Sequence, residues 1–430
     1  MIHFAGTLGF GDLASLASND SLFAATAVEK LEQLQAELRP LSERYDVVVA
    51  NPPYMGSKNM NKWLGEWVKE NYPDVKGDLF SCFMVRNSKM GSDHAQMGFM
   101  TPYVWMFIST YEKLRKFVIE KNTITSLIQL EYSGFAGATV PICTFTLQKG
   151  YVEGYKGGYI RLSDFVGADQ QAPRALEALA NPDCGWLFAR SSRSFDSIPG
   201  TPIAYWLSEK FIQAFTWPSI GSTIDSSTGM KTGDNDQFLR HWWEISNSAF
   251  NSESASLEES ISSLAKWFPY NKGGDFRKWY GNNDEVINWR NNGEDIKTPP
   301  EKGVRHFQLI KDKWMFATHV TWTKICSSDT SFRLKERGHL FDMAGASLIP
   351  ATRNEALAVL AFCNSSVAKL LLRVLAPTLN YQSGDIANLP FAKNGNDCCI
   401  VELAEDSVRL SKKDWDSYEE SWDFARHPLV

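Results

Sequence analysis

The stretch that decides the fold is Tyr45-Asp46-Val47-Val48-Val49-Ala50-Asn51-Pro52-Pro53-Tyr54. Its first six residues form the apolar run of a buried strand. The two consecutive prolines fix their own φ angles and push the residues before them out of the helical region. We therefore expect a buried strand that opens into a rigid loop, from which Asn51, backbone carbonyls and the Tyr54 ring project in set directions.

This loop, Asn51-Pro52-Pro53-Tyr54, is called the NPPY loop below, and it has the groups needed to hold an amine on a flat ring. The Asn51 side-chain oxygen and a proline carbonyl can accept hydrogen bonds from an amino group, while Tyr54 can stack on the ring that carries it. The pattern predicts methylation of the amino group of a base. A plain turn without chemistry is the alternative interpretation.

Length and composition indicate a folded protein of two domains. The chain has 430 residues, 43% of them hydrophobic and 22% charged, which is enough for two separate cores. No apolar run approaches 20 residues, and the N-terminus lacks the basic, apolar and small-residue order of a secretion signal. We expect a cytoplasmic protein with no membrane partner. Without CxxC, HxxxH or HxH spacing, we also expect free thiols and no metal site.

The net charge of −6 does not indicate a nucleic-acid-binding protein, because phosphates are neutralised by clustered lysine and arginine. It does not exclude one either. Acidic segments such as 253–259 and 414–423 can carry the excess charge away from a basic cleft.

Hydrophobic periodicity predicts the elements of the first half. We expect helices over 25–38, 61–71, 78–90 and 109–121, and strands over 45–50, 96–101, 124–130 and 140–148. Alternation of strands and helices indicates a mostly parallel sheet, with the last two strands as an antiparallel hairpin at its edge. The NPPY loop follows the carboxyl end of a strand, where open sheets of this kind bind ligands.

Three motifs of this half resemble those of the adenine-N6 DNA methyltransferases: the NPPY loop, Asp78-Leu79-Phe80, and residues 98–102. The loop at 132–135 extends the match, because Phe135 stands where that family has a second aromatic residue. The resemblance implies that S-adenosyl-L-methionine is the methyl donor and that the target adenine is flipped out of double-stranded DNA.

The resemblance also implies a role for each residue of the loop. Tyr54 and Phe135 would sandwich the flipped adenine, and Pro53 would keep the loop rigid. Asn51 and the carbonyl of Pro52 would accept both amino hydrogens and so turn the nitrogen lone pair toward the methyl group. No strong base is needed, because orientation and the sulfonium leaving group supply most of the barrier reduction.

The second half resembles the recognition region of the PglX methyltransferases of BREX phage-defence systems, and the resemblance covers nearly the whole chain. Its motifs are residues 229–240, 242–244, 266–280, 338–342 and 364–380. Basic side chains there are candidates for phosphates or guanine edges, and amides for adenine edges. The candidates are Lys231, Arg240, Lys272, Arg277, Lys278, Lys324, Arg333, Asn271, Asn282 and Gln382. Only the clustering of Lys272 to Lys278 carries weight.

The predicted fold class is therefore α/β: an incomplete Rossmann-like methyltransferase sheet followed by an α+β target-recognition domain. Residues 1–165 form the partial catalytic domain, residues 166–202 a linker or irregular connection, and residues 203–430 the DNA target-recognition domain.

The glycine-rich cofactor loop of the family is not found before the NPPY loop. Residues 6–11 are rich in glycine, but no strand precedes them and no acidic residue follows at the required distance. A sheet cut this way leaves exposed edges and half a cofactor pocket, with Asn51 as the one predicted cofactor-binding residue.

We therefore expect an adenine-specific DNA methyltransferase that needs a missing N-terminal part. Its expected partners are double-stranded DNA, a separate N-terminal methyltransferase fragment and other BREX proteins. The alternative is a catalytically inactive DNA-recognition or assembly subunit of a defence complex. A protein-glutamine methyltransferase is a third interpretation, since NPPY also suits a side-chain amide, but such enzymes need no long Trp-rich region.

Overall fold

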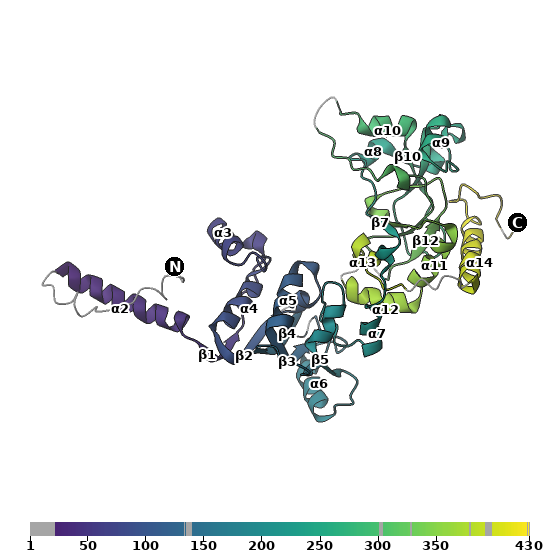
Figure 1. Cartoon of the computed structure of the whole chain (residues 1–430). Coiled ribbons are helices and arrows are strands. Elements are labelled where there is room, and N and C mark those ends of the chain that lie inside the picture. The colour runs from purple at the N-terminus through teal and green to yellow at the C-terminus, as the bar shows by residue number, and fades with distance from the viewer. Residues whose placement is uncertain are drawn as a thin grey trace. The chain divides into compact units, whose positions relative to one another are not determined.

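The computed structural model describes residues 22–430 except 133, 135–139, 301–303, 327–328, 378–379, 392–397, 428 and 430. The predicted stacking residue Phe135 and the glycine-rich residues 6–11 lie outside the described residues. The chain divides into two compact units, one ending at Leu207 and the other beginning at Ser208 (Figure 1). Each unit is described by itself.

The first unit is a mixed six-stranded sheet with helices. Its strands are β1 (Tyr45–Ala50), β2 (Gly91–Pro102), β3 (Asn122–Gln129), β4 (Ile142–Lys149), β5 (Gly157–Arg161) and β6 (Leu187–Arg190). Its helices are α2 (Leu22–Ser42), α3 (Lys62–Asn71), α4 (Leu79–Met90), α5 (Glu112–Lys121) and α6 (Ala168–Ala180). The strand order in the sheet is β1-β2-β4-β3-β5-β6.

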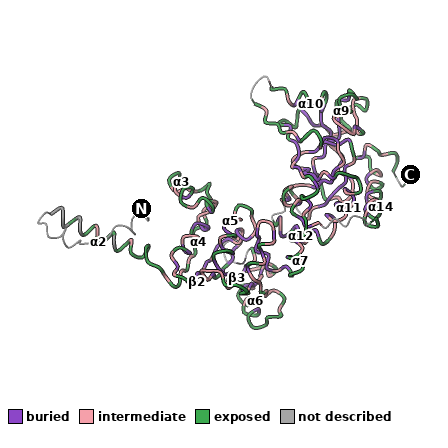
Figure 2. Tube along the Cα trace, viewed as in Figure 1, coloured by how far each residue is buried: buried purple, intermediate pink, exposed green. Residues whose placement is uncertain are grey.

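Helices α4 and α5 cover one face of this sheet. Phe80 and Met84 of α4 and Val118 of α5 share a core with Phe99 of β2 and Phe145 of β4, all of them buried. On the other face, α6 covers β5. The part of that face over β1, β2 and β4 is exposed among the described residues, as is most of α2, drawn in green in Figure 2.

Most of the predicted elements are confirmed, but three predictions about their arrangement are wrong. The strand at 45–50 has the predicted bounds but not the predicted burial, since none of its six residues is buried, and β3 and β4 pair as the predicted antiparallel hairpin. However, only β1/β2 and β3/β5 pair in parallel among the five pairings described, so the sheet is mixed rather than mostly parallel. The hairpin is not at the edge of the sheet, because β5 and β6 extend the sheet beyond β3.

The third error is the linker at 166–202, which contains α6 and β6. Gln171 fixes α6 in place, since its amide nitrogen donates to the carbonyls of Phe165 (2.6 Å) and Gly167 (2.9 Å) and its oxygen accepts from the Glu131 amide (3.1 Å). Buried Ala178 packs beside Leu162. A buried polar side chain and a small alanine therefore fix α6, while Trp186 and Leu187 pack against the same cluster as Ala178.

The second unit contains two four-stranded sheets. The first has the order β13-β9-β10-β8 and the second β12-β11-β14-β7. The strands are β7 (Asp225–Ser227), β8 (Leu239–His241), β9 (Trp267–Asn271), β10 (Glu285–Asn288), β11 (His319–Trp322), β12 (Phe332–Lys335), β13 (Leu340–Phe341) and β14 (Ser347–Ile349).

Eight helices of the described chain belong to this unit: α7 (Glu209–Ala214), α8 (Asn235–Phe238), α9 (Leu257–Ser262), α10 (Arg290–Lys297), α11 (Arg353–Cys363), α12 (Ser366–Leu375), α13 (Ser383–Ala387) and α14 (Cys398–Trp415). No single helix in the described ranges has the length and hydrophobicity of a membrane span, and the one pair that reaches them together, α11 and α12, is bent by 74°.

Candidate functional site

The NPPY loop leaves the carboxyl end of β1 with its polar groups exposed. Pro52 is buried, whereas Asn51, Pro53 and Tyr54 are exposed. The Tyr54 hydroxyl lies 3.3 Å from two acceptors, Asn51 Oδ1 and the carbonyl oxygen of Met100. Burial of the ring raises the pKa of Tyr54, so the hydroxyl stays protonated and acts as a donor at neutral pH. At 3.3 Å these bonds are long, and a better donor can compete for Asn51 Oδ1.

The Tyr54 ring packs against a second aromatic residue. It meets Phe80 edge to face, with ring centroids 6.5 Å apart and an interplanar angle of 89°. Phe80 is buried, while Tyr54 keeps 38% of its surface exposed. One face of the tyrosine is therefore positioned by the core and a substantial part of the ring remains free to contact a flat ligand.

Asp78 fixes the NPPY loop to the start of α4. Its Oδ1 accepts from the Met55 amide (3.0 Å) and from the Phe80 amide (3.3 Å), so one carboxylate oxygen holds the loop and caps the helix. The Leu79 amide donates to the Met55 carbonyl (3.0 Å). Burial raises the pKa of Asp78, while the backbone amides oppose that shift. Asp78 thus caps the helix predicted at 78–90, and the motif 78–80 lies directly against the loop.

The third motif of this half, residues 98–102, lies beside the loop on β2. Ala50 pairs with Phe99 in parallel register, and Val49 pairs with Gly98. A Cβ added at Gly98 would lie 3.6 Å from a methyl group of Val49, so the two strands pack closely there. The sheet thus brings together the three described motifs that suggested the resemblance.

The other side of β1 is open in the described part of the chain. β1 pairs only with β2 there, and Val47 and Val49 are 62% and 76% exposed. Valine side chains in the middle of a strand are usually covered, and an unpaired strand edge is a ready site for pairing with another strand. The NPPY loop therefore leaves the sheet beside a hydrophobic surface without a described partner.

The basic residues predicted for DNA differ widely in their availability. The Lys231 side chain is exposed. Arg240 donates to the carbonyl of Asp236 (2.7 Å), and Lys278 donates to the carbonyl of Asn364 (2.9 Å). Arg277 pairs with Asp414 (3.0 Å) and lies over the Trp415 ring. The predicted cluster of Lys272 to Lys278 therefore does not form one free basic surface.

The predicted DNA contact of Arg333 is wrong for this structure. Arg333 has no exposed surface, and its guanidinium donates to the Arg277 carbonyl (3.2 Å) and to Thr323 Oγ1 (3.1 Å). Burial lowers the pKa of Arg333 to about 10. Its neighbour Lys335 is also buried and donates to the carbonyls of Gly281 and Asn282, both at 2.9 Å. The two cations hold the 273–283 loop instead of facing solvent.

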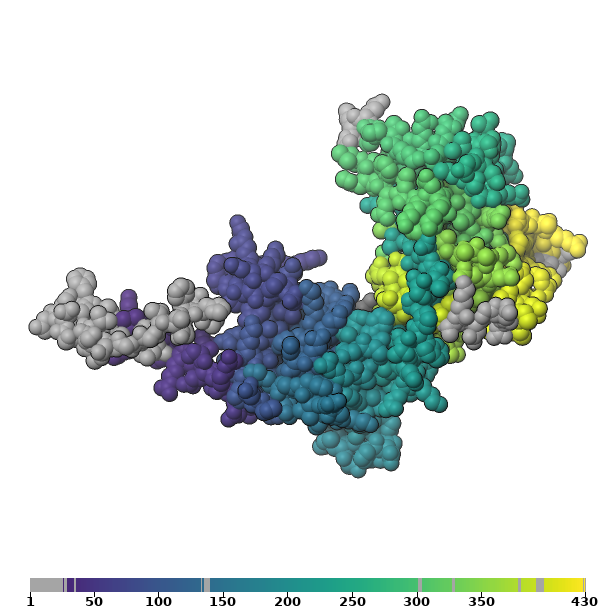
Figure 3. Space-filling view, in the orientation of Figure 1, coloured from purple at the N-terminus to yellow at the C-terminus, as the bar shows by residue number. Residues whose placement is uncertain are grey.

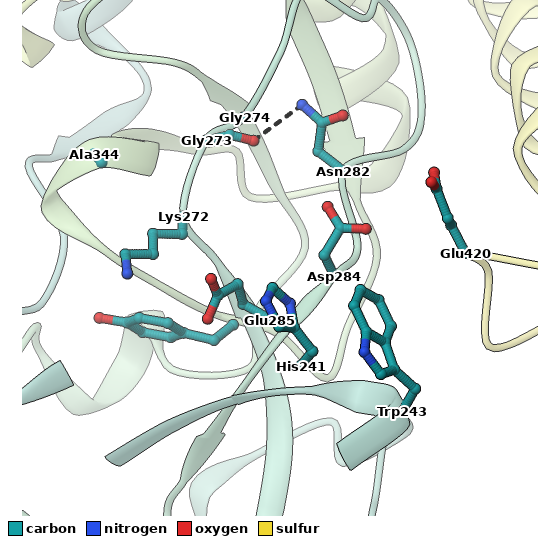
Figure 4. A pocket seen from close by; sticks show the side chains of 11 residues that line it. His241, Trp243, Lys272, Gly273, Gly274, Asn282, Asp284, Glu285, Ala344 and Glu420 are labelled. Atoms are coloured by element: carbon teal, nitrogen blue, oxygen red, sulfur yellow. Dashed lines mark hydrogen bonds between the residues drawn. The ribbon is translucent and has the colours of Figure 1, made fainter. Parts of the chain in front are cut away.

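Lys272 lines a pocket of about 460 Å³ in the second unit (Figure 4). Asp284 and Glu285 lie between Lys272 on one side and Trp243 on the other. Trp243 stacks on His241 with ring centroids 4.5 Å apart, and burial raises the pKa of Asp284. The sequence offered no signal for this pocket, because its residues come from five separated segments.

A segment of the first unit is similar to a known family of methylases. Residues 13–135 match the family model described as Eco57I restriction-modification methylase.

The resemblance to the PglX methyltransferases is confirmed by two curated relatives. The chain is 35% identical over 402 residues to the adenine-specific methyltransferase PglX of Lacticaseibacillus casei (strain Zhang), covering 91% of this chain and 33% of the relative. It is 31% identical to the adenine-specific methyltransferase BrxX of Escherichia coli O9:H4 (strain HS), covering 99% of this chain and 36% of the relative. The chain thus spans about one third of the length of these relatives.

Among solved structures, the Type IIL restriction-modification enzyme MmeI in complex with DNA is 10% identical, with a TM-score of 0.48 over 88% of this chain and 50% of that one. A TM-score below 0.5 supports no inference about this chain.

Proposed function

We propose that this chain is the part of an adenine-specific DNA methyltransferase that carries the NPPY loop and the target-recognition domain. It would act in BREX-type phage defence, in the cytoplasm, on double-stranded DNA. The observation that carries the proposal is the NPPY loop itself: an exposed Asn51 beside a half-exposed Tyr54, at the end of a sheet strand, in a chain similar to adenine-specific methyltransferases over nearly all its length.

The loop has the geometry to orient an amino group. Asn51 Oδ1 and the Pro52 carbonyl are two acceptors on adjacent residues, and adenine N6 has two hydrogens to donate. Holding both hydrogens fixes the direction of the nitrogen lone pair. The base ring would stack on Tyr54, which Phe80 holds by direct ring contact and Asp78 holds indirectly through the loop. Phe135 is proposed for the opposite face of the base.

The residues present fit the reacting end of an S-adenosyl-L-methionine site. When bound, S-adenosyl-L-methionine supplies an electrophilic methyl group. Asn51 is the residue of this chain that would contact it, because it is exposed at the carboxyl end of β1, the end at which sheets of this type bind ligands. The exposed edge of β1 and the exposed Val47 and Val49 lie beside this position.

The open edge of β1 favours a sheet that continues into further chain. We therefore infer an incomplete Rossmann-like methyltransferase sheet that an N-terminal part would complete, in keeping with the one third of its relatives' length that the chain spans. That part, as a fused or separate segment, would supply the rest of the cofactor site. Other BREX proteins are proposed partners. The same open edge also suits a catalytically inactive recognition or assembly subunit, which is the second candidate.

For the second unit we propose target recognition. Lys231 and Lys272 are the proposed phosphate contacts, since neither ammonium group has a hydrogen-bond or ion-pair partner among the described residues; Lys272 shares its pocket with Asp284, Glu285 and Glu420. Three other predicted residues would have to give up their present hydrogen-bond or ion-pair partners before they could contact DNA: Arg240, Arg277 and Lys278.

The test is incorporation of labelled methyl groups into duplex DNA by the chain alone and with the N-terminal part of a relative. Asn51→Ala should abolish incorporation while DNA binding is retained. Asn71→Ala, an exposed asparagine outside the loop, is the matched control and should leave both unchanged. Methylation by Asn51→Ala would refute the acceptor role. No methylation in either mixture would leave the inactive recognition subunit as the function.

A further inference from the structure

The segment between the NPPY loop and α4 is an excursion whose two ends are fixed together. The Ser57 amide donates to the Gly77 carbonyl (3.0 Å), and Gly56 forms a β-bridge with Asp78. Residues 57–77, with α3 at their centre, therefore start and end at the catalytic loop. In Figures 1 and 3 the α3 segment protrudes from the first unit beyond the end of α4.

The inner face of α3 is well packed, so the helix is held firmly. Val68 is 1% exposed, and Leu64 and Trp67 pack against the same core. Trp67 also meets Tyr72 at a centroid distance of 5.6 Å. The side chain of Asn61 caps the helix by accepting from the Leu64 amide at 2.8 Å. Whatever α3 presents on its outer face is thus presented in a fixed position.

The N-terminal end of α3 presents an exposed indole, and two exposed lysines lie near it in the sequence, Lys62 on α3 and Lys58 in the turn before it. Trp63 is 71% exposed, although it stands one turn before the half-buried Trp67. Lys58 and Lys62 are exposed, neither has an ion pair among the described residues, and the first turn of α3 has no acidic residue. A large exposed aromatic residue is energetically unfavourable in water and is typical of a surface that binds something flat or apolar.

We propose that Lys58, Lys62 and Trp63, named here the α3 tip, contact the DNA that flanks the flipped adenine. The inference rests on the proposed function and adds residues that position its substrate. The two ammonium groups complement phosphates, and the positive end of the helix dipole adds to their attraction. The indole packs against a flanking base or sugar, because stacking on aromatic side chains tolerates every base and gains most where flipping has removed a neighbour.

The experiment measures binding of the chain to a fluorescently labelled duplex by anisotropy over a range of salt concentrations. Trp63→Ala should weaken binding about tenfold, and Trp63→Phe by less. The double variant Lys58→Ala/Lys62→Ala should lower the slope of log affinity against log salt by about 2. Lys69→Ala is the matched control, because Lys69 is exposed on the same helix at its opposite end. It should bind as the wild type does.

The outcomes separate this inference from the proposed function. If the wild type binds duplex DNA and both the Trp63→Ala and the double lysine variants bind equally well, the α3 tip has no such role while the proposed function stands. If the wild type binds no duplex at any salt concentration, both the role of the α3 tip and the proposed function are refuted. Circular dichroism should show unchanged helix content in all variants, since the substituted side chains are exposed.

Discussion

Replacing Asp78 by alanine removes the side-chain oxygen that joins the NPPY loop to α4 in the described structure. Asp78 Oδ1 accepts from Met55 and Phe80 amides, and no other side chain among the described residues accepts from these two groups. The loop would keep the backbone bond between Leu79 and Met55. We expect it to open locally much more often, while the rest of the sheet stays folded.

The magnitude follows from the two lost bonds. Loss of a helix N-cap costs about 1 kcal/mol, and loss of a second, partly buried hydrogen bond costs about 1 kcal/mol more. The local opening free energy should therefore fall by about 2 kcal/mol, which raises amide exchange about 30-fold. Asp78→Asn keeps an oxygen acceptor and removes the charge that burial disfavours, so it should stay within about 1 kcal/mol of the wild type.

Hydrogen exchange followed by mass spectrometry on peptides covering 51–56 measures this effect. Asp74→Ala is the control, because its exposed ion pair with Lys113 contributes less than about 0.5 kcal/mol and is outside the loop. Equal exchange in the wild type and in Asp78→Ala would show that the carboxylate does not hold the loop. Equal exchange in Asp78→Asn and Asp78→Ala would show that charge, not hydrogen bonding, is decisive.

Three further expectations follow from single contacts. Tyr54→Phe keeps the ring against Phe80 and should reduce methyl transfer less than tenfold. Tyr54→Ala should reduce kcat/KM by up to about 100-fold, because the stacking on the base is lost. Equal losses of activity in the two variants would refute the stacking role. Lys272→Ala should lower the slope of log DNA affinity against log salt concentration by about 1. Lys278→Ala loses the hydrogen bond to the Asn364 carbonyl, so it should lower the unfolding temperature and leave that slope unchanged. Burial lowers the pKa of His319 to about 4, so between pH 4 and 6.5 the unfolded state binds more protons than the folded state. The free energy of unfolding should therefore fall by roughly 3 kcal/mol as the pH falls through that window. In His319→Gln, which cannot take up this proton, the free energy of unfolding should fall by less.

The strand, the loop and the cap could be predicted because each depends on local chemistry. A valine run, two prolines and an Asp at a helix start constrain the backbone within a few residues. The arrangement of α6 and β6 could not be predicted, because it depends on Gln171. The hydrogen-bond partners of Gln171, Phe165 and Gly167, are close in the sequence, but its burial depends on the tertiary structure. Burial of a polar side chain has no periodic signature.

The basic residues of the second unit show the same limit. Phe332-Arg333-Leu334-Lys335 alternates as a half-exposed strand would, which predicts that the two cations face solvent. All four residues of β12 are buried instead. Carbonyl groups of the 273–283 loop cover the polar side and accept from Arg333 and Lys335. A cation that holds a loop and one that meets a phosphate look identical in a sequence.

The open side of β1 leads to a prediction that tests whether the proposed N-terminal part binds there. Val49 is 76% exposed, so Val49→Lys should change the unfolding free energy of this chain by less than about 0.5 kcal/mol. If an N-terminal part covers β1, the same change replaces a buried valine, worth about 1.5–3 kcal/mol, and should weaken association with that part at least tenfold. Titration calorimetry with the N-terminal part measures this, with Leu179→Lys on α6, 69% exposed, as the control. Equal affinity of Val49→Lys and the wild type would place the completing chain elsewhere. A loss confined to Val49→Lys would identify β1 as the strand on which the sheet, and with it the methyl-donor site, is completed.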